Sequence, residues 1–346
     1  MTRPDTAPNN VQTRGAVTRR RALALFGAAA GLPLTAAIAG ARPPAGACLY
    51  AWHGTALGAV AQITLCHEDR AEAERIVGMC VDEIARLEKV FSLHRPDSEL
   101  VRLNRDGRLH APSHDMVKLL TESQKFGALT EGAFDVTVQP LWRVYADHFA
   151  ANPDDAAGPA PDAVARALDR VDYRAMDIGA GAVVFTRDGM AVTLNGIAQG
   201  YITDRVADLL RANGIGSVLL ELGETRALDR HPEDRPWRIG LTDPRDPARI
   251  SRTLELENRA VATSGGYGTQ FDSHGRFHHL FDPHSGASAG EMISVSVMTA
   301  RATVADALST ALYVMAPARH AALVKSVPDI TAFITPAAGD TRRLTS

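Results

Sequence analysis

The chain has 346 residues, of which 45% are hydrophobic and 22% charged, a composition typical of a globular protein with one large or two ordinary domains. The formal net charge is −3, and no block rich in Lys or Arg lies beyond the N-terminus. The electrostatic footprint of a nucleic-acid-binding protein is therefore missing.

The first segment, residues 1–41, is predicted to be a cleaved export signal. Three arginines at 19–21 precede an apolar run at 22–39, and cleavage after Ala39 or Ala41 fits the small-residue rule. Adjacent arginines before an Ala-rich core favour the twin-arginine export machinery, and the general export route is the alternative. A retained anchor is disfavoured because a spanning helix needs about 20 apolar residues. The mature protein is therefore expected in the periplasm.

The three cysteines are Cys48, Cys66 and Cys80, an odd number without C-x-x-C spacing. Neither a disulfide framework nor a thiolate metal site is indicated, so we expect small buried side chains. Cys48 follows the predicted cleavage site in "PAGAC", which leaves a lipid anchor open, although the two prolines before it are unusual for one.

Along the mature chain, the pattern predicts helices and strands without a regular β-α-β alternation. Apolar residues recur at threes and fours in residues 67–91, which is typical of an amphipathic helix. The Pro- and Gly-rich residues 151–165 are predicted to be a loop-rich insertion. A further helix is expected to begin at the N-cap Thr203 and end at Gly214. Strands are predicted at "AVTL" (191–194), "SVLLEL" (217–222), "ISVSVM" (293–298) and "ITAFIT" (330–335). The fold class is therefore α+β.

A helix with a buried face is predicted over residues 301–315, "RATVADALSTALYVM". Asp306 and Thr310 lie four residues apart, which places their Cβ atoms about 5–6 Å from each other on one helix face. Two oxygen donors at this spacing could share a hard cation, and Mg²⁺ fits best because it favours few carboxylates plus phosphate oxygens. Alone, the same pair is also compatible with a solvated face or a helix cap.

Glycines mark a candidate anion site in "TLNGIAQGYITD", residues 193–204. Gly196 and Gly200 flank an expected turn between a strand and the N-terminus of a helix. Free N–H groups there, together with the helix dipole, would favour a phosphate. The segments "GAFDVTVQPLW", "ELGETRA" and "VATSGGYG" also combine glycine with polar residues, and each is compatible with an ordinary turn.

In chain order, "FSLHRPDSELVRLN", "GAFDVTVQPLW", "LNGIAQGYITD", "ELGETRA", "VATSGGYG", "HHLFDPHSG" and "ADALSTALYVM" resemble the ApbE family of FAD:protein FMN transferases. The resemblance runs from about Thr55 to Met315. It implies one catalytic domain over residues 42–346 that uses Mg²⁺ and transfers FMN from FAD to a Thr or Ser hydroxyl of an acceptor flavoprotein, releasing AMP.

Two alternatives remain to this activity, namely a FAD diphosphatase that gives FMN and AMP to water, and a non-catalytic flavin-binding protein. The segment "LNGIAQGYITDRVADLL" resembles the sequences of the subgroup associated with nitrous-oxide respiration, whose acceptor is a membrane flavoprotein.

The resemblance also implies roles for individual residues. The Mg²⁺ ligands fall on Asp306, Thr310 and the backbone carbonyl of Gly196. The FAD contacts fall on Ala133, Phe134, Asp135, Thr193, Gln199 and Leu280. Thr193 and Gln199 stand where many relatives carry charged residues, and His53 stands where Met is usual.

Four histidines in "SHGRFHHLFDPHSG", residues 273–286, first suggest a transition-metal site. The resemblance instead places one histidine of the pair beside the diphosphate. His279 is the expected catalytic residue, as a base for the acceptor hydroxyl or as a cation that stabilises the transition state. His274, His278 and His284 are expected at the loop surface.

The arginine pair gives a direct test of the export route. Changing both Arg20 and Arg21 to Lys should trap the precursor in the cytoplasm, because the twin-arginine machinery recognises the guanidinium pair. Fractionation followed by immunoblotting measures this, and unchanged export would favour the general route.

Overall fold

The computed structural model describes residues 49–346. The predicted export signal, its arginines and Cys48 lie outside the described residues. In the described part, no helix is long and apolar enough to cross a membrane. Of the other cysteines, Cys80 is buried in the core as predicted, whereas Cys66 is half-buried.

The centre of the molecule is an eight-stranded antiparallel sheet in the order β1-β2-β6-β7-β10-β11-β12-β13. Its strands are β1 (Leu49–Ala56), β2 (Ala59–Cys66), β6 (Val218–Glu221), β7 (Thr225–Leu228), β10 (Ala260–Gly265), β11 (Met292–Thr299), β12 (Thr331–Pro336) and β13 (Arg342–Thr345). Together with the helices around it, this sheet confirms the α+β class.

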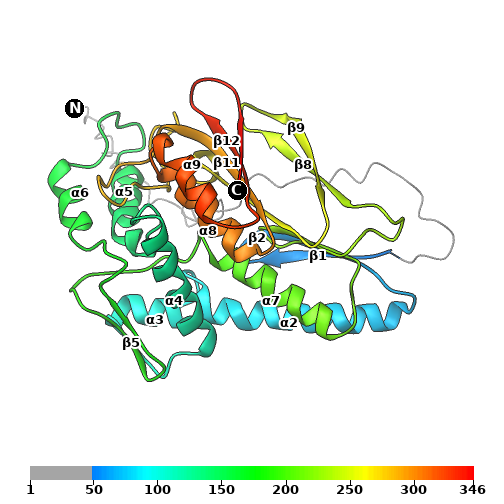
Figure 1. Ribbon diagram of the computed structural model, residues 1–346. Coiled ribbons are helices and arrows are strands. Elements are labelled where there is room, and N and C mark those ends of the chain that lie inside the picture. The colour runs from blue at the N-terminus through cyan, green and yellow to red at the C-terminus, as the bar shows by residue number, and fades with distance from the viewer. Residues whose placement is uncertain (1–48) are drawn as a thin grey trace, which may run out of the picture.

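Three helices cover one face of the sheet: α2 (Arg70–Phe91), α7 (Ala198–Ala212) and α8 (Ala302–Val314). α8 packs on β10 and β11, and α7 lies between α8 and α2 (Figure 1). The apolar stripe predicted for residues 67–91 is the buried face of α2, which begins after its N-cap Asp69. The helix predicted over 301–315 is α8, so both predictions are confirmed.

The other face of the sheet is covered by a hairpin of β8 (Trp237–Asp243) and β9 (Asp246–Leu256). Successive side chains of β6 pack on opposite faces of the sheet. Val218 and Leu220 join the core under the helices, whereas Leu219 joins a second cluster with the hairpin. This alternation follows from the two-residue period of a strand.

The remaining elements surround the sheet and its covering helices, and most of them lie on the left in Figure 1. They are α3 (Glu99–Asp106), α4 (His114–Leu129), α5 (Gln139–Ala151), α6 (Pro161–Leu168), α9 (Pro317–Ser326), the small sheet β3 (Arg108–His110), β5 (Ala182–Phe185) and β4 (Met176–Ile178), and the short 3₁₀ helices η1 (Val136–Val138) and η2 (Gly266–Gly268).

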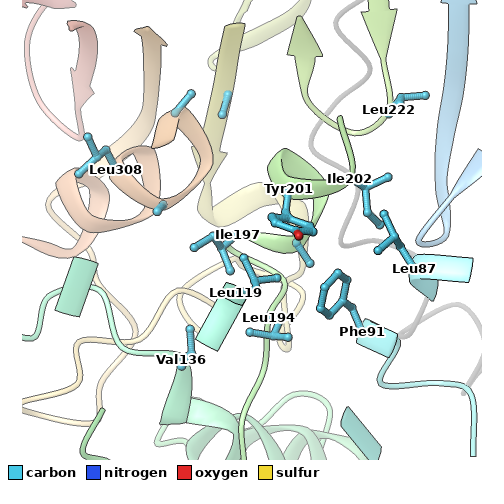
Figure 2. Packing of buried hydrophobic residues seen from close by; sticks show 14 of the residues in the cluster. Leu87, Phe91, Leu119, Val136, Leu194, Ile197, Tyr201, Ile202, Leu222 and Leu308 are labelled. Carbon is cyan, nitrogen blue, oxygen red and sulfur yellow. The ribbon is translucent and has the colours of Figure 1, made fainter. Parts of the chain in front are cut away.

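The core between α2, α4 and α7 is centred on Tyr201 (Figure 2). Its ring packs edge-on against Phe91 with centroids 5.6 Å apart. Its hydroxyl donates a 2.6 Å hydrogen bond to Asp115, and Arg86 pairs with the same carboxylate at 2.8 Å. Burying a phenol in an apolar core requires such a partner for its hydroxyl.

The predicted start of α7 at Thr203 is wrong, because the helix begins at Ala198. Thr203 is buried one turn inside the helix, and its hydroxyl donates to the carbonyl of Gln199 at 2.8 Å. A threonine can satisfy its hydroxyl in this way within a helix, so its presence did not mark an end. As a consequence, Gly200 lies inside the first turn of α7 and not in a loop.

The strand predicted at residues 191–194 is also wrong, because this segment has no regular secondary structure and belongs to no sheet. The side-chain amide of Asn104 replaces a neighbouring strand there: it donates to the Val192 carbonyl at 2.8 Å and accepts from the Val192 N–H at 2.6 Å. The Thr193 N–H donates to the Val136 carbonyl. The strands predicted at 217, 293 and 330 are confirmed as β6, β11 and β12.

The loop predicted at residues 151–165 is correct only in its first part. Residues 152–160 are irregular, but the chain becomes helical at Pro161, the first residue of α6. Proline is favoured at this position because the first N–H of a helix has no partner in the helix. Val164 and Leu168 then pack on the aromatic cluster around α5.

The contact between α7 and α8 is closest at Gly200, where a Cβ atom would lie 2.4 Å from the Ala302 carbonyl oxygen. We expect Gly200→Ala to lower the free energy of unfolding by about 1–3 kcal/mol, because backbone must move to relieve the clash. Gly78→Ala, at an exposed position in α2 where a Cβ meets nothing within 4 Å, is the control. It should raise stability by up to about 1 kcal/mol through helix propensity. Urea denaturation of both variants checks this, and equal stabilities would contradict it.

Candidate active site

A cavity of about 720 Å³ opens where the N-terminal part of α7, the inner face of α8 and the end of β10 meet. All ten residues singled out from the sequence line it. They are Ala133, Phe134, Asp135, Thr193, Gly196, Gln199, His279, Leu280, Asp306 and Thr310. The chain separates the first from the last by more than half its length, so the fold brings distant segments to one place.

Oxygen atoms gather at one side of this cavity. Asp306 is buried on α8, and Thr310 follows one turn later on the same face. Gly196 approaches them from the segment before α7, because a Cβ atom at this glycine would lie 3.0 Å from the Thr310 hydroxyl oxygen. The predicted set of Asp306, Thr310 and Gly196 is therefore assembled in space.

The side chain of Asp306 is fixed by α7. One of its oxygens accepts a 3.0 Å hydrogen bond from the Gly200 N–H in the first turn of that helix. This corrects the phosphate cradle predicted from the glycines, because at least this N–H already has an acceptor within the protein. The anion that α7 binds with this N–H is the carboxylate of Asp306 itself.

The relation between α7 and α8 is reciprocal. The Asp204 carboxylate of α7 accepts hydrogen bonds from the Ala302 N–H at 2.8 Å and the Thr303 N–H at 3.0 Å. These are the first N–H groups of α8, whose own N-cap residue, Arg301, makes no side-chain capping bond. Each helix is thus capped by an aspartate of the other.

Glu224 is a carboxylate of the site that the sequence analysis missed. It lies in the turn between β6 and β7, is buried, and lines the cavity with Asp306. Burial raises its pKa well above the usual value, and the charge of Asp306 adds to this rise. No local signal identified it, because an acidic residue in a turn between two strands is usually exposed to solvent.

The pKa of Asp306 is also raised, mainly by burial and further by the charge of Asp204, while the Gly200 hydrogen bond opposes the rise. The folded chain therefore concentrates carboxyl groups where their ionised forms repel one another. A bound cation would relieve this repulsion, and the donors around it are a carboxylate, a hydroxyl and backbone. Such an all-oxygen set fits Mg²⁺ and does not fit a soft transition metal.

His279 is half-buried and faces the same cavity. Its Nδ1 lies 3.2 Å from the Thr269 carbonyl oxygen, which can only accept, so Nδ1 carries the proton and Nε2 keeps its lone pair. Burial lowers the pKa of His279 to about 4, with a smaller contribution from His278. The ring is therefore neutral at physiological pH, so that Nε2 keeps a free lone pair toward the cavity.

The expected surface location of His278 is wrong, because this residue is buried. Its Nε2 donates to the Ala289 carbonyl at 2.8 Å, and its Nδ1 accepts from the Leu280 N–H at 3.3 Å. These bonds give the imidazole a structural role in shaping the loop that carries His279. His274 and His284 are exposed, as predicted.

Within residues 49–346, no group of three or more His, Cys, Asp and Glu side chains is arranged to hold a metal. The exposed His284 bonds Asp282, and the buried His278 bonds backbone, so these rings do not converge. The candidate cation site at Asp306 is of another kind, because the donors proposed for it are oxygens and include no imidazole or thiolate.

The position of Asp135 limits what its side chain can do. One oxygen accepts from the Thr137 N–H and hydroxyl, and the other accepts from the Tyr173 N–H at 2.9 Å. Burial raises its pKa to about 6 against these hydrogen bonds. The carboxylate therefore holds the turn before η1, and contact with a ligand is left to the backbone of this segment and to its neighbours.

The comparisons with known proteins point to one family. A family model described as the ApbE family matches residues 57–334. The chain is 32% identical over 238 residues to a FAD:protein FMN transferase of Treponema pallidum, which covers 63% of this chain and 65% of that protein. It is 29% identical over 298 residues to a FAD:protein FMN transferase of Klebsiella pneumoniae, covering 83% and 89%. The first match spans just under two thirds of the relative's length.

Solved structures give the same result for the fold. The apo form of the Pseudomonas stutzeri flavinyl transferase ApbE superposes with a TM-score of 0.74 at 27% identity, covering 86% of this chain and 95% of that one. The flavin transferase ApbE of Vibrio cholerae superposes with a TM-score of 0.75 at 25% identity, covering 87% and 97%. The architecture is thus shared over nearly the whole described chain.

Proposed function

Because the chain belongs to the ApbE family, we propose that it is an enzyme that transfers FMN from FAD to a hydroxyl of an acceptor protein. The observation that carries the proposal is the cavity, which unites an oxygen cluster suited to a cation with a neutral histidine. These are the groups that a phosphoryl transfer needs, since such a reaction depends on positioning and charge stabilisation more than on covalent catalysis.

The lining of the cavity suits FAD along its length. Asp306 and Thr310 mark a polar region for the diphosphate. Trp142, Tyr267 and Phe134 add aromatic surface against which a planar ring can pack. A pocket with mostly apolar walls and a few convergent polar groups is typical of a cofactor-sized ligand.

Gln199 places a neutral amide in the cavity. It lies over Gly223, where a Cβ atom would come within 2.6 Å of the Gln199 amide nitrogen. A neutral amide there brings no charge of its own beside Glu224 and Asp306. Neutralising the carboxyls is thereby left to a bound cation.

Mg²⁺ would be held by Asp306, Thr310 and the backbone of Gly196, and when bound it would neutralise charge on the diphosphate. The Gly200 N–H holds one oxygen of the Asp306 carboxylate, which fixes its orientation. The Ser264 hydroxyl, 3.1 Å from the Thr310 hydroxyl, holds the second donor in place. The protein therefore supplies a preorganised set of oxygens.

In the transfer step, the acceptor hydroxyl oxygen forms a bond to the phosphorus of the FMN half, and the bond from this phosphorus to the bridging oxygen breaks. AMP leaves with that oxygen. His279 accepts the hydroxyl proton at Nε2, because its Nδ1–H is directed at the Thr269 carbonyl. The low pKa of His279 favours this role over that of a permanent cation.

The acceptor is proposed to be a flavoprotein modified at Thr or Ser, in the periplasm, with the membrane flavoprotein of nitrous-oxide respiration as the candidate. The export signal predicted at residues 1–41, with its arginine pair, supports this location. The competing FAD diphosphatase activity would release free FMN in place of a labelled acceptor. In-gel flavin fluorescence of the acceptor after incubation with FAD and Mg²⁺ separates the two.

The first prediction from this proposal concerns the cation. Asp306→Asn keeps the oxygen that accepts from Gly200 but removes the charge, so the variant should fold normally. Loss of a residue that only contacts a metal ligand typically lowers affinity or activity by about 10- to 100-fold. Asp306 is itself a proposed ligand, so flavinylation of the acceptor should fall by at least about 100-fold. High Mg²⁺ should restore part of the activity by mass action. Thr310→Val should show a milder defect of the same kind.

The measurement is the initial rate of flavinylation against Mg²⁺ concentration, with circular dichroism to check folding. Asp208→Asn is the matched control, because Asp208 is an exposed acid on α7. A wild-type Mg²⁺ dependence in Asp306→Asn would show that the cation binds elsewhere.

The second prediction concerns the histidine. His279→Ala should lower the rate of FMN transfer by about 100-fold or more, the usual scale of lost general-base catalysis. His274→Ala, in the same loop region but exposed, should be nearly silent. Single-turnover assays with saturating FAD measure both. Equal losses at the two positions would refute the assignment of His279.

A further inference from the structure

The oxygen cluster depends on where α8 begins, and α8 has no N-terminal cap of its own. Arg301 precedes the helix and makes no side-chain capping bond. Asp204, 98 residues earlier, replaces it by accepting from the N–H groups of Ala302 and Thr303 and from the Thr303 hydroxyl at 2.6 Å. A capping residue that belongs to another helix stabilises α8 and also fixes its orientation about its axis and its position along that axis.

Asp204 is itself held in place by a buried ion pair. Arg226 on β7 donates from Nη1 to the Asp204 carboxylate at 2.5 Å, and both side chains are buried. The three donors from α8 and the guanidinium together satisfy a carboxylate that would otherwise be costly to bury. The chain from β7 through Asp204 to α8 is therefore rigid.

The position of Asp306 follows from this arrangement by helix geometry. It lies one turn after Ala302, and Thr310 lies one turn after Asp306, so all three share one side of α8. Their distance from Gly196 is set by the contact of Gly200 with Ala302, which leaves no room for a side chain. A shift of the first turn of α8 would move both oxygen donors together.

We propose that Asp204 is the positioning residue of the cation site: by capping α8 it sets Asp306 and Thr310 at the distance from Gly196 that Mg²⁺ requires. Asp204 acts through α8 and does not touch the ion. The inference rests on the proposed function, because it takes the Mg²⁺ site at Asp306 as given.

The test uses FAD-loaded protein without acceptor and measures the Mg²⁺ concentration that half-saturates its thermal stabilisation. The double variant Asp204→Ala/Arg226→Met removes the cap without leaving a buried guanidinium unpaired. Its half-saturating Mg²⁺ concentration should rise about 10- to 100-fold, the usual effect of an outer-shell partner of a ligand. Asp204→Asn keeps one acceptor oxygen and should recover most of the affinity.

Asp115→Ala is the matched control for stability alone. Asp115 is also a buried carboxylate, but it bonds Arg86 of α2 and Tyr201 of α7 and therefore does not hold the first turn of α8. It should lower the melting temperature without changing the half-saturating Mg²⁺ concentration.

Two results would overturn the inference, and they are distinguishable. If the Asp204 variants melt earlier but bind Mg²⁺ as the wild type does, Asp204 is a structural residue only and the proposed function stands. If Mg²⁺ stabilises neither the wild type nor Asp306→Asn, or stabilises both equally, the cation site of the proposed function fails and the positioning role fails with it.

Discussion

The reciprocal capping of α7 and α8 is the constraint on which the rest of the site depends. Two helices meet at their first turns, and neither begins with a residue that caps it. Asp204 binds the N–H groups of Ala302 and Thr303, and Asp306 binds the N–H of Gly200. Because each carboxylate comes from the partner helix, neither helix can move without exposing the N–H groups of the other. The first turns of α7 and α8 are therefore held rigidly against each other beside the cavity.

The arrangement has an electrostatic cost that is concentrated at the cavity. Asp204 is compensated by Arg226, whereas Asp306 and Glu224 face each other in a buried place, and the pKa of both is raised. The fold thus buries two carboxyl groups, Asp306 and Glu224, whose ionised forms are destabilised in the absence of a cation. The proposed cation would bind more tightly because it relieves this repulsion, so the raised pKa values favour ligand binding at the expense of the stability of the empty site.

The sequence predicted those features that depend on local pattern. The period of α2 and the Asp306–Thr310 spacing are properties of a few turns of helix, and both appear in the structure. The errors arose where a backbone group finds its partner far along the chain. Residues 191–194 bond the side chain of Asn104, and α7 begins five residues before the expected cap, with its Gly200 N–H bonded to Asp306. No local pattern contains these partners.

One helix also connects the two reactive ends of the site. Tyr313 lies one turn after Thr310 on α8, and its hydroxyl accepts from the Gly266 N–H at 3.1 Å and lies 3.5 Å from His278 Nε2. His278 in turn shapes the loop of His279 through its bond to the Ala289 carbonyl. The helix that carries Asp306 and Thr310 thus also supports the loop of His279. The distance between the proposed cation site and His279 is consequently set by the packing of α8, and the proposed in-line phosphoryl transfer would need such a fixed distance.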